Sequence, residues 1–222
     1  MNSKHICQNI TKINDEIGNS VRLIAVSKTK PNEDILEAYH CGQRDFGENK
    51  VQELVGKYEA LPKNIHWHLI GHLQRNKVKY IASFVHLIHS VDNIKLLKEI
   101  NKQAIKNNRI IPVLLQVKIA KEDTKFGMHF DETKNLLFSD ELQKLQNVKI
   151  VGLMGMATNT TDKTVVAQEF SALKSFFDKL KTQFPDFKYL SMGMSGDYQI
   201  AIENGSNMVR VGSSIFGKRN YM

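Results

Sequence analysis

The chain has 222 residues, of which 41% are apolar and 24% are charged, and these values are ordinary for a folded globular protein. It has no long uncharged apolar run and no charged-then-apolar leader, so we expect neither a membrane span nor a secretion signal. The net charge of +8 is spread along the chain without an arginine-rich block, which argues against a dedicated nucleic-acid surface. Cys7 and Cys41 lack metal-site spacing and need not pair, so a reduced, cytoplasmic compartment fits best.

The first elements alternate between helix and strand. Isoleucines at spacings of four, three and four predict an amphipathic helix that ends at Gly18 (Ile6, Ile10, Ile13 and Ile17). The continuous apolar run at residues 23–26 is typical of a strand buried on both faces. A second helix is predicted from Pro31, which suits a first helical turn, to Gly42.

The same alternation continues to the end of the chain. Further strand-like segments lie at residues 44–47, 66–70, 84–89, 111–119, 148–154, 189–192 and 208–211. Eight strands separated by helical patterns predict an α/β fold, and this count favours a closed (β/α)₈ TIM-type barrel over an open doubly wound sheet. We expect a single domain, residues 1–222, in which the N-terminal helix replaces the missing last helix of the outer ring.

Small residues follow the last two predicted strands. Gly193, Ser195 and Gly196 follow one strand, and Gly212 and Ser213 follow the other. Barrels of this kind often bind phosphate in these two loops, because small residues let backbone N–H groups approach an anion. Tight turns alone would also explain either cluster, but the two together favour a phosphate site.

Two cationic residues at strand ends are candidates for the chemistry. Lys28 follows the first buried strand, and a lysine partly removed from water has a lowered pKa and can attack an aldehyde. Lys30 is the alternative, but Pro31 indicates that the chain has already turned away. Arg210 ends the last strand, where a pyridine nitrogen would accept its hydrogen bond and remain unprotonated.

The histidines do not predict a metal site. His66 and His68 share one strand face, yet no third ligand with convincing spacing follows and no His-Glu-x-x-His motif occurs. We therefore expect no bound metal, and we expect His68 to line the barrel interior or to form local hydrogen bonds.

Several motifs, in order along nearly the whole chain, resemble those of the pyridoxal phosphate homeostasis proteins, formerly the proline-synthetase co-transcribed family. They are Ala25-Val26-Ser27-Lys28-Thr29-Lys30-Pro31, Phe46-Gly47-Glu48-Asn49, Trp67-His68-Leu69-Ile70-Gly71, Leu190-Ser191-Met192-Gly193-Met194-Ser195, Val209-Arg210-Val211-Gly212-Ser213, and Ile215-Phe216-Gly217 with Arg219 and Tyr221. The resemblance implies a barrel like the N-terminal domain of alanine racemase. A local departure is Phe126, where smaller residues are common, and we expect it to leave the cofactor site untouched.

The resemblance also implies a cofactor and its ligands. Pyridoxal 5′-phosphate (PLP) would form a Schiff base with Lys28, with Asn49 beside its ring and Arg210 facing its pyridine nitrogen. The phosphate would be held by Ser195, Gly212 and Ser213.

The implied function is the binding, buffering and delivery of PLP, with PLP-dependent apoenzymes as recipients and no catalytic turnover. The first alternative, an amino-acid racemase, needs a base on each face of the cofactor, and we expect no second domain to supply one. A Schiff-base aldolase acting on a sugar phosphate is a further alternative, although aldolases of this type carry their lysine on a later strand.

Overall fold

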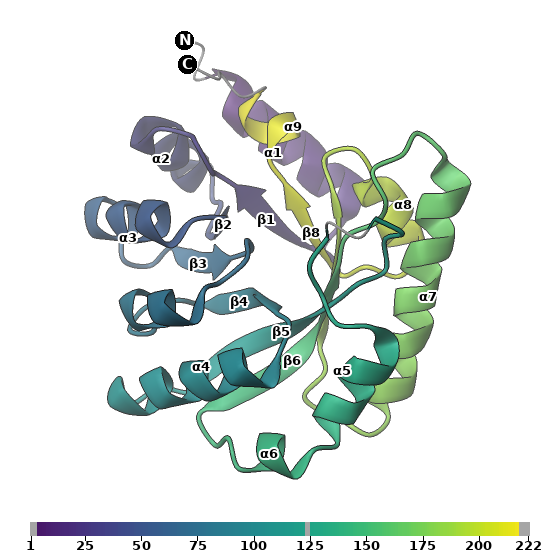
Figure 1. Ribbon diagram of the computed structural model, residues 1–222. Helices are drawn as coiled ribbons and strands as arrows, with labels where there is room; N and C mark the ends of the chain where they lie inside the picture. Colours follow the sequence, from purple (N-terminus) through teal and green to yellow (C-terminus); the bar gives the residue numbers. More distant parts are fainter. Residues whose placement is uncertain (1–3, 123–124, 218–222) are drawn as a thin grey trace.

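Eight parallel strands, hydrogen-bonded in chain order, close into a barrel when β8 pairs with β1 (Figure 1). This computed structural model describes residues 4–122 and 125–217. The strands are β1 Arg22–Val26, β2 Asp45–Glu48, β3 His66–Leu69, β4 Leu87–Val91, β5 Ile111–Val117, β6 Val148–Gly155, β7 Tyr189–Met194 and β8 Met208–Val211. The predicted (β/α)₈ barrel is confirmed, and the open doubly wound sheet is excluded.

Helices cover the outside of the barrel (Figure 1). They are α1 Lys4–Ile17, α2 Asn32–His40, α3 Val51–Ala60, the 3₁₀ helix η1 Arg75–Tyr80, α4 Ile94–Lys106, α5 Phe130–Leu137, α6 Asp140–Gln143, α7 Lys163–Lys181, α8 Tyr198–Glu203 and α9 Ser213–Phe216. None of the helices in the described ranges combines the length and the apolar character that crossing a lipid bilayer demands.

The N-terminal helix α1 completes the outer ring beside the short α9. Its four predicted apolar positions are all buried, at 2–7% exposure (Ile6, Ile10, Ile13 and Ile17). α1 packs against α2 and α9, and Asn9 Nδ2 donates a hydrogen bond to the carbonyl of Ile215 at 3.0 Å. The expectation that this helix replaces the missing last helix is therefore confirmed.

One strand begins later than predicted. The expected segment 84–89 is observed as β4, which starts at Leu87. Phe84 N and Val85 N donate instead to the carbonyl of Ile81, at 3.1 and 2.9 Å, so residues 81–85 form a turn after η1. Ile81 and Val85 are fully buried in this turn. A short apolar run does not distinguish a buried turn from a buried strand, and here tertiary packing decided.

Successive residues of a strand pack into two separate apolar clusters. Ile24 belongs to the cluster inside the barrel, whereas its neighbours Leu23 and Ala25 belong to the cluster between the sheet and the helices. This follows from the alternation of side chains across a strand. The inner cluster holds six fully or almost fully buried apolar residues: Ile24, Leu87, Leu114, Val151, Met154 and Met208.

The two cysteines join α1 to the end of α2. Cys7 and Cys41 form a disulfide, with Cα atoms 5.6 Å apart. The sequence left pairing open and favoured a reducing compartment, so this disulfide is a departure from that expectation. The pairing arises because Cys7 of α1 comes to lie beside the end of the neighbouring helix.

Candidate cofactor-binding site

A cavity of about 460 Å³ opens at the carboxyl ends of the strands. Its lining includes every residue predicted for cofactor binding: Lys28, Asn49, Ser195, Arg210, Gly212 and Ser213. These residues follow or end β1, β2, β7 and β8, which are consecutive neighbours in the closed barrel. Among the described lining residues there are lysines and an arginine but no Asp or Glu, so the cavity attracts an anion.

Lys28 lies in a tight turn directly after β1. Lys30 N donates to the carbonyl of Ser27 at 3.0 Å, and Thr29 has a φ of 64°, in the left-handed region. A β-branched residue rarely adopts this conformation. Thr29 N donates to Glu53 Oε1 at 2.6 Å, and this contact stabilises the turn that presents the half-buried Lys28 to the cavity.

A buried ion cluster supports the turn. Lys57 Nζ donates to Ser27 O and Glu48 Oε1, both at 2.8 Å, and to Glu53 Oε1 at 2.6 Å. The Ser27 hydroxyl donates to Glu48 Oε1 at 2.6 Å. Burial raises the pKa of Glu48 to about 7, although the charge of Lys57 opposes the shift. These contacts bind both residues that flank Lys28 and so set the direction of its side chain.

Lys30 lines the same cavity, but its ammonium group is engaged elsewhere. Lys30 Nζ donates to the carbonyls of Phe216 at 2.8 Å and Gly217 at 3.3 Å, at the end of α9. These contacts hold the Lys30 ammonium group at the end of α9.

The loops after β7 and β8 meet at one side of the cavity. Ser195 Oγ accepts a hydrogen bond from Gly212 N at 3.1 Å. Gly193 has a φ of 97°, which suits glycine, and an added Cβ would lie 2.6 Å from Ala201 Cβ. α9 begins at Ser213, and its first backbone hydrogen bond is from Ile215 N to Gly212 O. The backbone N–H groups of Ser213 and Ser214, which precede Ile215, are of the kind that binds anions at the start of a helix.

Arg210 is buried inside the end of the barrel. Its Nη1 donates to the carbonyl of Ser191 at 2.8 Å and to Ser191 Oγ at 2.6 Å, and its Nη2 donates to the carbonyl of Gly155 at 3.0 Å. Burial lowers the pKa of the guanidinium to about 10, and the charge of Asp197 opposes this shift. The group therefore remains a cationic donor at neutral pH.

A chain of hydrogen bonds leads from Arg210 through the barrel to its other end. Ser191 Oγ lies 3.2 Å from His89 Nδ1, His89 Nε2 lies 2.9 Å from His68 Nδ1, and His68 Nε2 lies 2.9 Å from Asp45 Oδ1. Both histidines are fully buried, and burial lowers the pKa of each. The expectation that His68 lies inside the barrel is confirmed.

The two ends of this chain determine the direction of its hydrogen bonds. Burial would raise the pKa of Asp45, but the hydrogen bond from His68 and the nearby cations lower it overall, so the carboxylate is ionised and only accepts. His68 Nε2 therefore carries the proton, and the Nδ1 atom of His68 accepts from His89 Nε2. His89 Nδ1 in turn accepts from the Ser191 hydroxyl. Arginine only donates, so Arg210 forms the other end.

Asn49 follows β2 and packs closely against the end of β3. A Cβ at Gly71 would lie 2.4 Å from the Asn49 carbonyl oxygen and 2.8 Å from its Cα. Only glycine allows this approach without a shift of the backbone. The close approach of Gly71 and Asn49 places Asn49 on the cavity wall.

Sequence reasoning missed part of the cavity wall. Gln116, a buried polar residue within apolar β5, lines the cavity and donates from Nε2 to the carbonyl of Phe126 at 2.9 Å. Phe126 also lines the cavity and stacks on His72, with ring centroids 4.3 Å apart. The expectation that Phe126 leaves the site untouched is wrong, because the loop after β5 folds back over the barrel mouth. The polar Gln116 in an apolar run was the available signal.

The comparison with known proteins agrees with this geometry. The family model described as alanine racemase, N-terminal domain, matches residues 1–220. The pyridoxal phosphate homeostasis protein of Aquifex aeolicus (strain VF5) is 42% identical over 205 residues, which cover 91% of this chain and 89% of that protein. Its namesake in Vibrio alginolyticus is 41% identical over 228 residues, covering 99% of this chain and 97% of that protein.

Solved structures show the same relationship. PipY of Synechococcus elongatus PCC7942, solved without PLP, has a TM-score of 0.89 and 36% identity, covering 96% of this chain and all of PipY. PipY has also been solved with PLP bound, with a TM-score of 0.86 and 35% identity over 96% of this chain and 100% of PipY. Alanine racemase from Bartonella henselae, at 16% identity, has a TM-score of 0.73 and shares the fold over 100% of this chain and 62% of the racemase. The chain belongs to the pyridoxal phosphate homeostasis protein family, which has the fold of the alanine racemase N-terminal domain.

Proposed function

We propose that this protein binds PLP in the cavity at the carboxyl ends of the strands, as a Schiff base with Lys28. The observation that carries the proposal is the combination of a lysine, a buried arginine and two small-residue loops around one cavity whose described lining contains no carboxylate. A phosphorylated aldehyde with an aromatic ring matches these groups. PipY, a relative at 35% identity, has been solved with PLP bound.

Each predicted residue has a distinct part in this proposal. Ser195, Gly212 and Ser213 hold the phosphate through hydroxyl and backbone donors, and Asn49 lies beside the ring. Arg210 donates to the pyridine nitrogen, because its guanidinium stays protonated and is held by Ser191 and Gly155. A pyridine nitrogen that only accepts a hydrogen bond makes the cofactor a weaker electron sink.

PLP-dependent enzymes use the cofactor as an electron sink that stabilises a carbanion, so a weaker electron sink favours a carrier over an enzyme. In the proposed role the protein holds reactive PLP on Lys28, buffers its concentration and releases it to PLP-dependent apoenzymes, in the cytoplasm and without turnover of its own. The curated relatives carry the name of a homeostasis protein, which supports this reading.

The racemase alternative requires a second base that faces the cofactor. Among the described residues that line the cavity there is no tyrosine, and His72, which lies 3.7 Å from Asp92 and stacks on Phe126, is the remaining candidate besides Lys30. Tyr221, considered for this part from the sequence, lies outside the described residues, as does Arg219. Absence of proton exchange at Cα of alanine, measured with the PLP-loaded protein in deuterated water, is the expected result for a carrier.

The proposed anchor is tested by an absorption spectrum before and after borohydride reduction, followed by peptide mass mapping. We expect a visible Schiff-base band and a reduced pyridoxyl adduct on Lys28. Lys28→Ala should lose both, whereas Lys30→Ala, the matched control, should retain the adduct on Lys28. An absence of any band after addition of PLP would refute the proposal and favour the sugar-phosphate aldolase, which borohydride traps with its substrate instead.

A further inference from the structure

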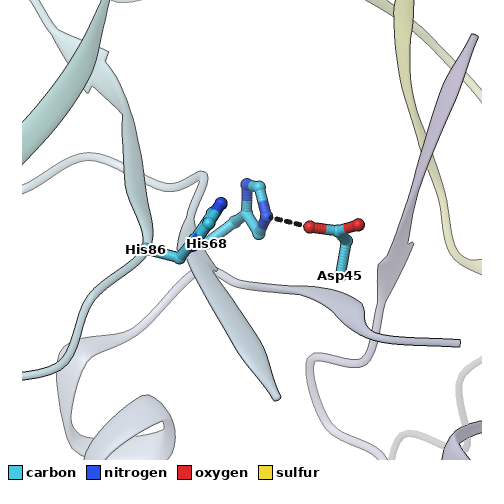
Figure 2. A group of neighbouring side chains, drawn as sticks. All are labelled: Asp45, His68 and His86. Atoms are coloured by element: carbon cyan, nitrogen blue, oxygen red, sulfur yellow. Dashed lines mark hydrogen bonds and ion pairs between the residues drawn. The ribbon is translucent and has the colours of Figure 1, made fainter. Parts of the chain in front are cut away.

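The end of the barrel opposite the cofactor cavity carries a cluster of imidazole and carboxylate groups (Figure 2). Asp45 begins β2, His68 lies within β3, and His86 immediately precedes β4. One potential ligand atom from each lies within 4.8 Å of the others. His66, at the start of β3, borders the cluster: its Nδ1 is 3.3 Å from Asp45 Oδ1, and its ring stacks on His86 with centroids 4.4 Å apart.

The three ligand atoms lie within 4.8 Å of one another, and the side chains would have to shift to reach the spacing found around a bound transition-metal ion. Zinc bonds to nitrogen and oxygen ligands are about 2.0–2.2 Å long, so ligand atoms around one tetrahedral ion lie roughly 3.3–3.5 Å apart. His68 Nε2 and Asp45 Oδ1 are 2.9 Å apart, so a modest outward movement of these side chains would admit an ion. β2, β3 and the residue before β4 supply the groups, so the paired strands keep the three side chains near one another.

Ligation by His68 requires the proton to leave Nε2, the nitrogen that donates to Asp45 when no ion is bound. In the other tautomer, His68 Nδ1 carries the proton and donates to His89 Nε2, 2.9 Å away, which is the outer contact that ligating histidines generally have. The His86 ring lies beside the His68 ring, with centroids 5.3 Å apart. The side chain of His66 is 46% exposed, so an ion can reach the cluster from solvent.

A cation borders the cluster and acts against binding. Arg22 Nη1 lies 3.7 Å from Asp45 Oδ1, and its side chain is 37% exposed. The guanidinium also lies over the ring of Tyr189, with its Cζ 5.4 Å from the ring centroid. Arg22 can move towards solvent, but while it stays in place its charge weakens attraction of the carboxylate for an ion.

We propose that Asp45, His68 and His86, with His66 as an additional ligand, bind one divalent transition-metal ion at the amino-terminal end of the barrel. Imidazole ligands with one carboxylate suit Zn²⁺ and the neighbouring ions Co²⁺, Ni²⁺ and Cu²⁺ rather than Mg²⁺ or Ca²⁺. The sequence showed no third ligand for His66 and His68. His86 immediately precedes β4 and Asp45 begins β2, and the pairing of both strands with β3 brings them together.

The test is titration of the full chain with Co²⁺ after treatment with a chelator, using protein without a polyhistidine tag. Tetrahedral Co²⁺ absorbs in the visible range, and we expect one ion per chain, displaced by Zn²⁺. His86→Ala and Asp45→Asn should each raise the Kd at least roughly tenfold, in line with effects of disturbing metal ligation. His40→Ala, which removes an exposed histidine of α2, should leave the Kd unchanged.

A variant that should bind the metal ion more tightly provides a second test. Arg22→Gln removes the opposing charge and leaves all four proposed ligands in place, so it should lower the Kd. The Arg22→Gln titration still tests the proposal if circular dichroism shows that a ligand variant does not fold. The proposal is overturned if wild-type protein gives no tetrahedral Co²⁺ spectrum, or if the spectrum and Kd are the same in His86→Ala and Asp45→Asn.

Discussion

Ser191 Oγ accepts a hydrogen bond from Arg210 Nη1 at 2.6 Å, and this contact joins the cofactor cavity to the buried polar chain that crosses the barrel. The Ser191 carbonyl accepts from the same Nη1 at 2.8 Å, so one residue holds the guanidinium twice. Arg210 is the group proposed to face the pyridine nitrogen. Its orientation depends on Ser191, which is not among the residues that line the cavity.

Ser191→Ala should destabilise the protein. It removes an acceptor from a buried cation and a partner from His89, and lost hydrogen bonds of this type cost about 1–3 kcal/mol. Urea unfolding followed by circular dichroism measures the change. Ser213→Ala, an exposed position at the start of α9, should stay within about 0.5 kcal/mol of wild type. Equal unfolding midpoints for Ser191→Ala and wild type would contradict the importance of this contact.

Gly71→Ala should weaken PLP binding by moving Asn49. The new Cβ would lie 2.4 Å from the Asn49 carbonyl oxygen, so the end of β2 or β3 must shift. Gly56→Ala is the matched control, because its Cβ meets nothing within 4 Å and alanine is favoured over glycine inside helix α3 by up to about 1 kcal/mol. We expect a lower melting temperature and a higher Kd for PLP only in Gly71→Ala. Unchanged values there would show that the close contact is readily relieved.

Ser195→Ala should discriminate between ligands with and without a phosphate group. A hydrogen bond to a charged group contributes about 1.5–3 kcal/mol, so the Kd for PLP should rise roughly tenfold or more. The Kd for pyridoxal, which lacks the phosphate, should not change. Equilibrium titration by absorption measures both values. A similar loss for both ligands would place Ser195 away from the phosphate.

Glu48 should make stability fall as pH rises. Burial raises its pKa in the folded protein to about 7, against the ordinary value of 4.5, so the folded state retains a proton that the unfolded state has lost. The free energy of unfolding therefore decreases between about pH 4.5 and pH 7, by an amount on the order of 1–3 kcal/mol.

Glu48→Gln tests this linkage because it removes the titrating group and keeps an oxygen for Lys57 and Ser27. Urea unfolding at intervals from pH 4.5 to pH 8 should show a smaller decrease in the variant than in wild type. The histidines with lowered pKa act equally in both proteins, so the difference isolates Glu48. Parallel curves would mean that Lys57 keeps Glu48 ionised throughout.

Much of the barrel was predictable from local patterns. The four-residue apolar run of β1 and the isoleucine stripe of α1 are properties of short segments, and each was observed where it was expected. The start of β4 was not predictable in this way. Phe84 and Val85 continue the apolar pattern, yet their backbone closes a turn, and the choice depends on packing against the rest of the barrel.

The sequence by itself determined the strand count and the lysine, arginine and small-residue loops at strand ends, because periodicity and residue order are local properties of the chain. Only the tertiary structure decided the contacts between separate segments. Ser191 meets Arg210, Asp45 meets His68 and His86, and Phe126 meets His72 because strand pairing and the return of the loop after β5 bring distant segments together. Such contacts depend on strand register and side-chain direction, and neither can be predicted from the spacing of residues along one strand.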